Sequence, residues 1–309
     1  MINIQKIPGM IEPIEQNLLM NFAANIDLSN GAIIEFGTYF GKSTACLING
    51  ILKNPSFTTE RIYLYSYDSF EAIIGHGFEE YVLKHAKSIK LENALIIDSN
   101  SVNFRSIYDY FLGSYENKIL KTNQIDIKNL SSFNKKIELI FIDCPKDYKN
   151  FIYIFEKFFP SLNKNSIIIF QDYFYFWSGT LIACIQIMLN DEMIKIKSTA
   201  ASSLIVELIK PIDMHYINKV KNIMENTNLS LLIHDSRNNF SDKSMDRYFI
   251  FYPRLILANL QYAYHNNSPR EVSEIMKNFL SNVNFINNNT LSDLSELISR
   301  KFYIETGNS

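Results

Sequence analysis

The chain has 309 residues, of which 47% are hydrophobic and 20% charged, with a formal net charge of -2. This length allows one large core, or one core plus an appended region. The small net charge gives no electrostatic reason to expect a nucleic-acid partner. The three cysteines lie far apart in apolar contexts, which argues against a disulfide framework or a zinc site. Neither a secretory signal nor a membrane span is predicted from the apolar runs. We therefore expect a cytoplasmic protein.

The first two thirds of the chain alternate between helical and strand-like patterns. Helices are predicted over 14–26, 43–53, 78–90, 148–159 and 178–190. Strands are predicted at 32–36, 61–70, 93–101, 137–143 and 165–173, with a last one inside 201–211. The polar segment 113–136 is expected to be a surface excursion between the third and fourth strands.

Strands that alternate with helices in this way are typical of an α/β fold, here a Rossmann-like, mostly parallel sheet with helices on both faces. The sheet is expected to end near Pro211, and the pattern beyond it is mainly helical, with a polar link over 234–246. We therefore predict a sheet domain over 1–212 and a helical C-terminal extension over 213–309. The extension would serve to form a homo-oligomer or to cover a substrate.

The segment AIIEFGTYFGKSTA, residues 32–45, raises the question of which ligand its turn binds. Its end is similar to a phosphate-binding P-loop, but three residues separate Gly37 from Gly41 and the P-loop needs four. Glu35, just before the turn, is badly placed for a phosphate and well placed for a cationic amino group. S-adenosylmethionine (SAM) carries an ammonium and no phosphate, so it fits better than ATP. Bulky Tyr39 argues against the close pyrophosphate approach of NAD.

Aspartates stand at the ends of four predicted strands: Asp68, Asp98, Asp143 and Asp172. The carboxyl ends of parallel strands meet at one edge of a sheet, and folds of this class bind ligands there. Asp68 follows the second strand, where a carboxylate can accept both ribose hydroxyls of an adenosine cofactor. A turn former or a helix cap is the alternative for any such aspartate, and also for Asp147.

Four segments together resemble the motifs of class I SAM-dependent methyltransferases in order and spacing: IIEFGTYFGKST, YLYSYDSFE, IELIFIDCPKDYKN and FFPSLNKNSIIIFQDYFYFWSG. They are most similar to the macrocin O-methyltransferase type, which acts on sugar hydroxyls, and the resemblance spans about residues 15–210. It implies SAM-dependent O-methylation of a sugar or glycosylated small molecule. The cofactor-binding residues that it implies are Glu35, Gly37, Thr38, Tyr39, Gly41, Ser43, Asp68, Ser69, Asp98 and Asn100.

The chain departs from that family where catalysis is expected. The family's fourth strand typically ends in Asp-Gly-Asp-His, where this chain has DCPK at 143–146, and its fifth in Asp-Asp-Tyr, where this chain has QDY at 171–173. The candidates for taking the acceptor proton are Asp143, Asp147 and Asp172. Asp143 and Asp172, with Gln171 as a neutral oxygen donor, are candidate ligands of Mg²⁺.

Two other functions stay open. A SAM-binding scaffold that has lost catalysis is suggested by Pro145 and Lys146 at the family's base positions and by Gln171. An iron-dependent hydroxylase would need two suitably placed histidines, and none of the five histidines adjoins Asp143 or Asp172 in sequence. His76 lies in a glycine-flanked loop that would cover a site or be solvated. The aromatic cluster ending at Trp177 suits either a sugar-binding surface or a core.

Overall fold

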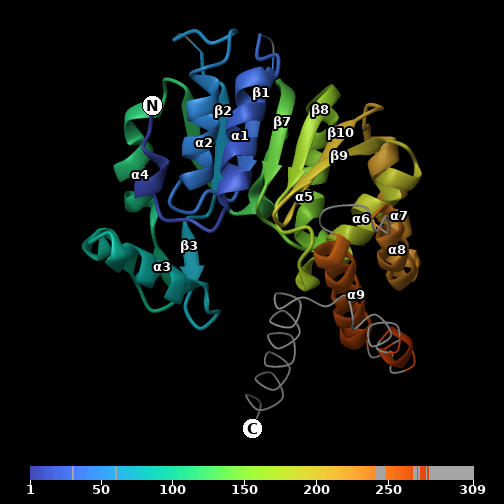
Figure 1. Cartoon of the computed structure of the whole chain (residues 1–309). Coiled ribbons are helices and arrows are strands. Elements are labelled where there is room, and N and C mark those ends of the chain that lie inside the picture. Colours follow the sequence, from blue (N-terminus) through green and yellow to red (C-terminus); the bar gives the residue numbers. More distant parts are fainter. Residues whose placement is uncertain are drawn as a thin grey trace. The chain divides into compact units, whose positions relative to one another are not determined.

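A computed structural model describes residues 1–29, 31–59, 61–240, 248–266, 270, 272–275 and 277 (Figure 1). The chain divides into two compact units. The first unit comprises Met1–Pro145, Tyr153–Gln171 and Ile196–Pro211, and the second comprises Lys146–Ile152, Asp172–Lys195 and Ile212–Ser309. The second unit also includes two segments of the expected sheet domain. The domain boundary expected after residue 212 stays a prediction.

A seven-stranded sheet in the order β6-β2-β1-β7-β8-β10-β9 is the centre of the fold. Its strands are β1 (Gly31–Phe36), β2 (Leu64–Asp68), β6 (Leu120–Gln124), β7 (Lys136–Ile142), β8 (Leu162–Phe170), β9 (Ile194–Ala200) and β10 (Ser203–Leu208). The strands from β6 to β8 pair in parallel, and β10 pairs antiparallel to β8. The predicted Rossmann-like, mostly parallel sheet is confirmed.

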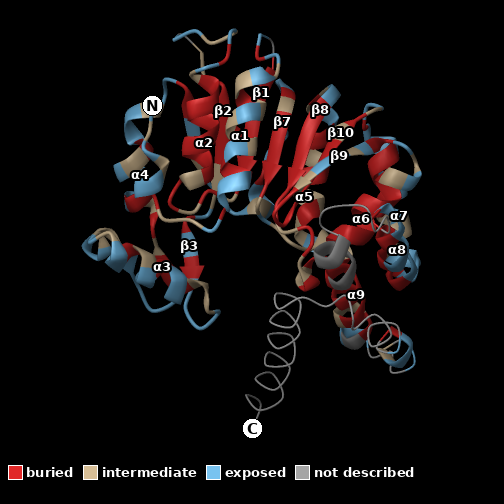
Figure 2. Cartoon of the chain, viewed as in Figure 1, coloured by how far each residue is buried: buried red, intermediate tan, exposed pale blue. Residues whose placement is uncertain are grey.

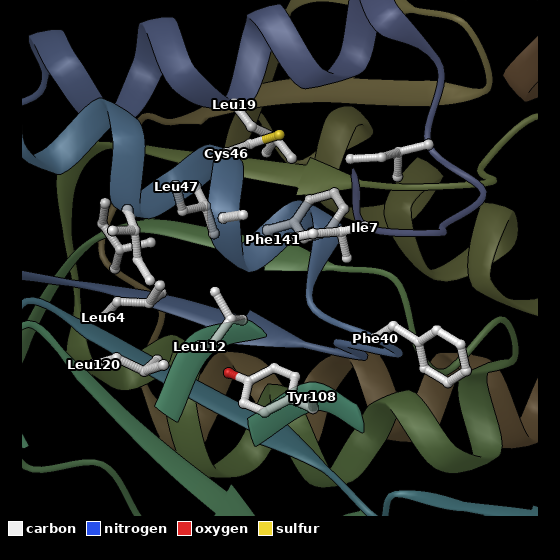
Figure 3. Close-up of a cluster of buried hydrophobic side chains, with 14 of the residues drawn as sticks. Ile7, Leu19, Phe40, Cys46, Leu47, Leu64, Tyr108, Leu112, Leu120 and Phe141 are labelled. Carbon is white, nitrogen blue, oxygen red and sulfur yellow. The ribbon is translucent and has the colours of Figure 1, made fainter. Parts of the chain in front are cut away.

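Both faces of the sheet are buried at its central strand β1, as the continuous apolar run predicts (Figure 2). One face packs against α1 (Pro13–Asn25), α2 (Lys42–Ile51) and α4 (Arg105–Leu112) through a large hydrophobic cluster (Figure 3). On the other face, Phe36 meets Phe158, at the end of α5 (Tyr148–Phe158), edge-on with 4.8 Å between ring centroids. Side chains alternate along a strand, so Glu35 lies on the α2 face while Phe36 lies on the α5 face.

Two expectations about the strands were wrong. The expected third strand does not join the main sheet: β4 (Ile96–Ile97) pairs with β5 (Ser101–Asn103), which pairs with β3 (Glu71–Ile73), in a separate antiparallel sheet. The expected surface excursion contains β6, which pairs with β2 at the edge of the main sheet. Its first residue, Leu120, is the one buried residue among the five of β6, so the apolar pattern gives no strand signal there.

Strand β9 was also missed. Its sequence, IKIKSTA, buries its two ends and leaves all the residues between them exposed or half-exposed. Such an edge strand carries few apolar residues, and edge lysines are typical of strands that must not pair further.

The second unit contains the C-terminal helices that the sequence predicts. They are α7 (Met214–Asn226), α8 (Leu229–Ser236) and α9 (Tyr248–His265). The unit also contains α6 (Gly179–Asn190), which was predicted at 178–190 within the sheet domain. The expected polar link over 234–246 was wrong in its first part, because α8 runs to Ser236 and a 3₁₀ helix, Arg237–Phe240, follows. Residues 241–246 lie outside the described residues, and so do most of the residues beyond 266. Within the described ranges, no helix combines the length and apolar character that crossing a bilayer requires.

Candidate active site

Asp68 holds the turn that follows β1. Its Oδ2 accepts hydrogen bonds from the backbone N of Thr38 at 2.7 Å and of Tyr39 at 3.1 Å. Its Oδ1 accepts one from the backbone N of Phe70 at 2.7 Å. The carboxylate thus fixes the glycine turn against the end of β2. Its expected contact with a ribose stays a prediction, and the loop-holding role was not foreseen because it depends on the pairing of β1 with β2.

The variant Asp68→Ala is expected to lower the free energy of unfolding by about 1–3 kcal/mol, because three backbone donors lose their acceptor. The measurement is a urea titration read at constant m-value. Asp98→Ala is the matched control, because Asp98 also accepts two backbone donors, from Asn100 and Ser101, but in an exposed turn where water replaces it. Equal losses in the two variants would contradict a special role for Asp68.

The two glycines of the turn have different reasons to be glycine. Both adopt left-handed backbone conformations, with φ of +83° at Gly37 and +93° at Gly41. A Cβ at Gly37 would lie 3.1 Å from the backbone N of Cys144. A Cβ at Gly41 would overlap Leu112 Cδ1 in α4. Gly41 therefore allows α4 to pack on the turn, and its contact with the cofactor stays a prediction.

Glu35 is a fully buried carboxylate below the turn. Its Oε2 accepts hydrogen bonds from Thr44 Oγ1 at 2.7 Å and Ser66 Oγ at 2.6 Å. Its Oε1 is buried and has no hydrogen-bond partner among the described residues. Burial raises the pKa of Glu35 to about 7, against the opposing effect of the neighbouring hydroxyls, which include that of buried Ser43. An acceptor oxygen without a donor beside a glycine turn fits a ligand that carries an ammonium group.

Tyr39 links the turn to α3 (Phe78–Ser88). Its hydroxyl donates to the backbone O of Tyr81 at 3.2 Å and lies 3.0 Å from His85 Nδ1. Its ring stacks on Phe40 with 4.2 Å between centroids. Tyr39 was predicted as a cofactor contact, and the structure gives it an anchoring role that the sequence does not reveal. His76, in the loop before α3, is exposed.

The remaining predicted cofactor residues lie in exposed turns. Asp98 Oδ1 accepts hydrogen bonds from the backbone N of Asn100 at 2.7 Å and of Ser101 at 2.8 Å, which closes the turn between β4 and β5. Ser69 Oγ accepts one from the backbone N of Glu71 at 3.3 Å. The turn-former alternative is what the structure shows for Asp98, and cofactor contacts of Ser69, Asp98 and Asn100 stay predictions.

The predicted catalytic and metal-binding residues divide between the two units. In the first unit, Asp143 follows β7 and donates its backbone N to Phe36 O at 2.8 Å. Gln171, also in the first unit, is buried and donates its backbone N to Ile142 O at 3.0 Å. Asp172 belongs to the second unit.

In the second unit, both predicted aspartates have partners. Asp172 Oδ2 lies 3.1 Å from the ammonium nitrogen of Lys146. Asp147 accepts hydrogen bonds from the backbone N of Asn150 at 2.9 Å and from its side-chain nitrogen at 3.0 Å. The helix-cap alternative is therefore what the structure shows for Asp147. Throughout the described part of the chain, no group of three or more His, Cys, Asp and Glu side chains could hold a metal ion.

The aromatic segment after Asp172 alternates between core and surface. Phe174 and Phe176 are buried, whereas Tyr175 and Trp177 are half-exposed. The rings of Tyr175 and Trp177 stack with 4.5 Å between centroids and 7° between planes, and the guanidinium of Arg254 lies 4.8 Å from the Tyr175 ring centre. Both readings of this cluster hold in part, because one side of the segment joins a core and the other presents stacked aromatic rings.

Residues 34–173 match the family model described as a methyltransferase domain, Methyltransf_24. The match covers slightly less than half of the chain and includes the glycine turn and the ends of β2, β7 and β8. These residues form a methyltransferase domain. The expectation of a methyltransferase is confirmed at this level, whereas the macrocin type is not.

Several solved structures are similar to the chain. The O-methyltransferase NovP has 13% sequence identity and a TM-score of 0.46, with 65% of this chain and 82% of that one covered. CalS11, a TDP-rhamnose 3'-O-methyltransferase, has 16% identity and a TM-score of 0.39, covering 62% and 76%. The O-methyltransferase from Bacillus cereus in complex with SAH has 13% identity and a TM-score of 0.37, covering 67% and 86%. Likenesses this distant transfer no substrate. No curated protein matches the sequence significantly.

Proposed function

We propose that the chain is a SAM-dependent O-methyltransferase that acts on a hydroxyl of a sugar or glycosylated small molecule. The observation that carries the cofactor assignment is Glu35, whose buried Oε1 has no donor among the described residues and lies at a glycine turn of a methyltransferase domain. A negative charge at this place repels phosphate and attracts an ammonium group. The sugar acceptor is supported by the resemblance of the four sequence motifs.

When bound, SAM supplies a methyl group on a positively charged sulfur. The glycine turn, fixed by Asp68, would hold the cofactor, and Glu35 would balance the charge of its ammonium group. The acceptor oxygen must lie in line with the methyl carbon, roughly 3 Å away. The acceptor oxygen would take the methyl group, and the electron pair of the broken carbon–sulfur bond would stay on the sulfur. The hydroxyl proton passes to a carboxylate, for which Asp143 and Asp172 are the candidates.

Asp147 is the weaker candidate for that proton, because both of its oxygens accept hydrogen bonds from Asn150 at the start of α5. Two observations favour a second function, a SAM-binding protein without catalysis. Asp147 accepts its hydrogen bonds from Asn150, and Asp172 is paired with Lys146. Such a scaffold would bind SAM and leave it unreacted with every acceptor.

The test is calorimetric titration of the full chain with S-adenosylhomocysteine (SAH), with ATP and NAD as controls. We expect SAH to bind with a Kd on the order of micromolar and the two controls to show no binding. An acceptor screen of free and nucleotide-linked sugars, read by mass spectrometry as a gain of one methyl group, then identifies the substrate class. Absence of SAH binding would refute the cofactor assignment. Binding without turnover on any acceptor would favour the scaffold.

A further inference from the structure

The ion pair between Lys146 and Asp172 lies within the second unit, and the two residues come from different segments of it. Lys146 Nζ is 3.1 Å from Asp172 Oδ2, and the side chains are 24% and 20% exposed. Long exposed side chains gain little from pairing, because water screens the charges and their ordering costs entropy. The side chains of Lys146 and Asp172 are each about four-fifths buried, so their charges attract each other more strongly than those of such surface pairs.

The backbone holds Asp172 in a defined position. Its φ is +59°, in the left-handed region that non-glycine residues rarely adopt. Its carbonyl oxygen accepts hydrogen bonds from Ser178 Oγ at 2.9 Å and from the backbone N of Tyr175 at 3.1 Å. The carboxylate therefore projects from a fixed turn, and Lys146 meets it there.

This arrangement does not fit a divalent metal at Asp172. Mg²⁺ needs several oxygen ligands in nearly ideal octahedral geometry. An ammonium group already lies within ion-pair distance of the carboxylate and would repel a second cation. Asp147, the next carboxylate along the chain from Lys146, is turned to Asn150. Of Asp147 and Asp172, the two predicted carboxylates in the second unit, Asp172 is the one left to a metal, and it is paired with a lysine.

We propose that Lys146 takes the place beside Asp172 that a divalent metal would need, and that methyl transfer proceeds without a metal ion. The proposal rests on the proposed function. Lys146 is then a positioning residue: its fixed positive charge holds the Asp172 carboxylate in the place where it takes the hydroxyl proton. The bonds made and broken are those of the methyl transfer above, and no further reactant is required.

The first experiment measures metal binding directly. The full chain is titrated into Mn²⁺, with and without SAH, and free Mn²⁺ is followed by electron paramagnetic resonance. We expect the free-ion signal to be unchanged by the protein at concentrations up to about 1 mM, a level at which a resident metal site would bind. Stoichiometric Mn²⁺ binding that Asp172→Asn abolishes would overturn the proposal. This readout needs neither cofactor nor acceptor, so it stays decisive even where the proposed function fails.

The second experiment removes the charge. Lys146→Gln is expected to lower kcat about 100-fold, as when a reacting group is misplaced by about 1 Å, with the Kd for SAH unchanged. Lys146→Arg keeps the charge and is expected to retain more activity than Lys146→Gln. Lys149→Gln, an exposed lysine three positions along the same stretch, is the matched control and should stay within about 2-fold of the parent.

Chelation separates the outcomes further. Turnover of the parent protein in excess EDTA should equal turnover in its absence, and loss of turnover restored by Mg²⁺ would overturn the proposal. Where Lys146→Gln does not fold, as judged by circular dichroism, Lys146→Arg and the Mn²⁺ titration still decide. An unchanged kcat in folded Lys146→Gln would contradict the role of the charge.

Discussion

Glu35→Gln is expected to stabilise the ligand-free protein at high pH. The difference in the free energy of unfolding, variant minus parent, should be more positive at pH 8 than at pH 5. The pKa of Glu35 is raised by burial from 4.5 to about 7. Between these values the unfolded chain is ionised while the folded chain keeps the proton, so rising pH progressively destabilises the folded state. The penalty is absent below about pH 4.5 and amounts to about 3 kcal/mol above pH 7.

Urea titrations of parent and variant at pH 5 and pH 8 measure this effect. The change in their difference between the two pH values cancels any constant cost of the amide. Glu80→Gln, an exposed carboxylate in α3, is the control and should show a change well below 1 kcal/mol. A difference that does not depend on pH would show that Glu35 keeps one protonation state over this range.

The same variant separates stability from binding. An ammonium group beside Glu35 favours its ionised form, so parent affinity for SAH should fall as the pH drops below about 7. Glu35→Gln should bind SAH roughly 10-fold or more weakly at pH 8, where a charge-assisted hydrogen bond is lost. A variant that is more stable and yet binds SAH less well would support the carboxylate as the ammonium partner. Unchanged affinity would contradict the cofactor assignment.

Gly50→Ala is expected to destabilise the protein, although alanine is the better helix former. Gly50 lies in α2, where α1 crosses it, and a Cβ there would lie 2.5 Å from Met20 O and 2.6 Å from Ala23 Cβ. Alanine gains about 1 kcal/mol of helix propensity. Overpacking costs about 3 kcal/mol, at the upper end of the usual range, because a backbone oxygen cannot rotate away. We therefore expect a net loss of about 2 kcal/mol.

Gly113→Ala provides a control of the opposite sign. Gly113 has a φ of -56°, which alanine adopts readily, and its added Cβ would meet only Asp109 Cβ, at 3.9 Å. This variant should be stabilised by about 0.4–1 kcal/mol through the unfolded chain. Thermal unfolding of both variants beside the parent checks the pair. A Gly50→Ala protein as stable as the parent would mean that α1 and α2 separate at little cost.

Sequence patterns identified the elements with both faces buried. Strands β1, β7 and β8 are continuous apolar runs because helices cover both sides of a parallel sheet. The turn after β1 was predicted together with Glu35, because two glycines and an acid in a short span leave few backbone choices. Short edge strands such as β6 and β9 carry little apolar signal, so their sequences resemble loops.

Tertiary structure decided what each predicted polar residue does. Asp68 holds the glycine turn because β1 and β2 pair side by side, and Asp98 closes a hairpin because β4 joins a separate small sheet. Lys146 and Asp172 meet although neither sequence neighbourhood indicates the other. Local sequence limits backbone conformation and burial, and these properties follow from the residues themselves. The partner of a charged side chain depends on contacts between distant segments, and these exist only once the chain has folded.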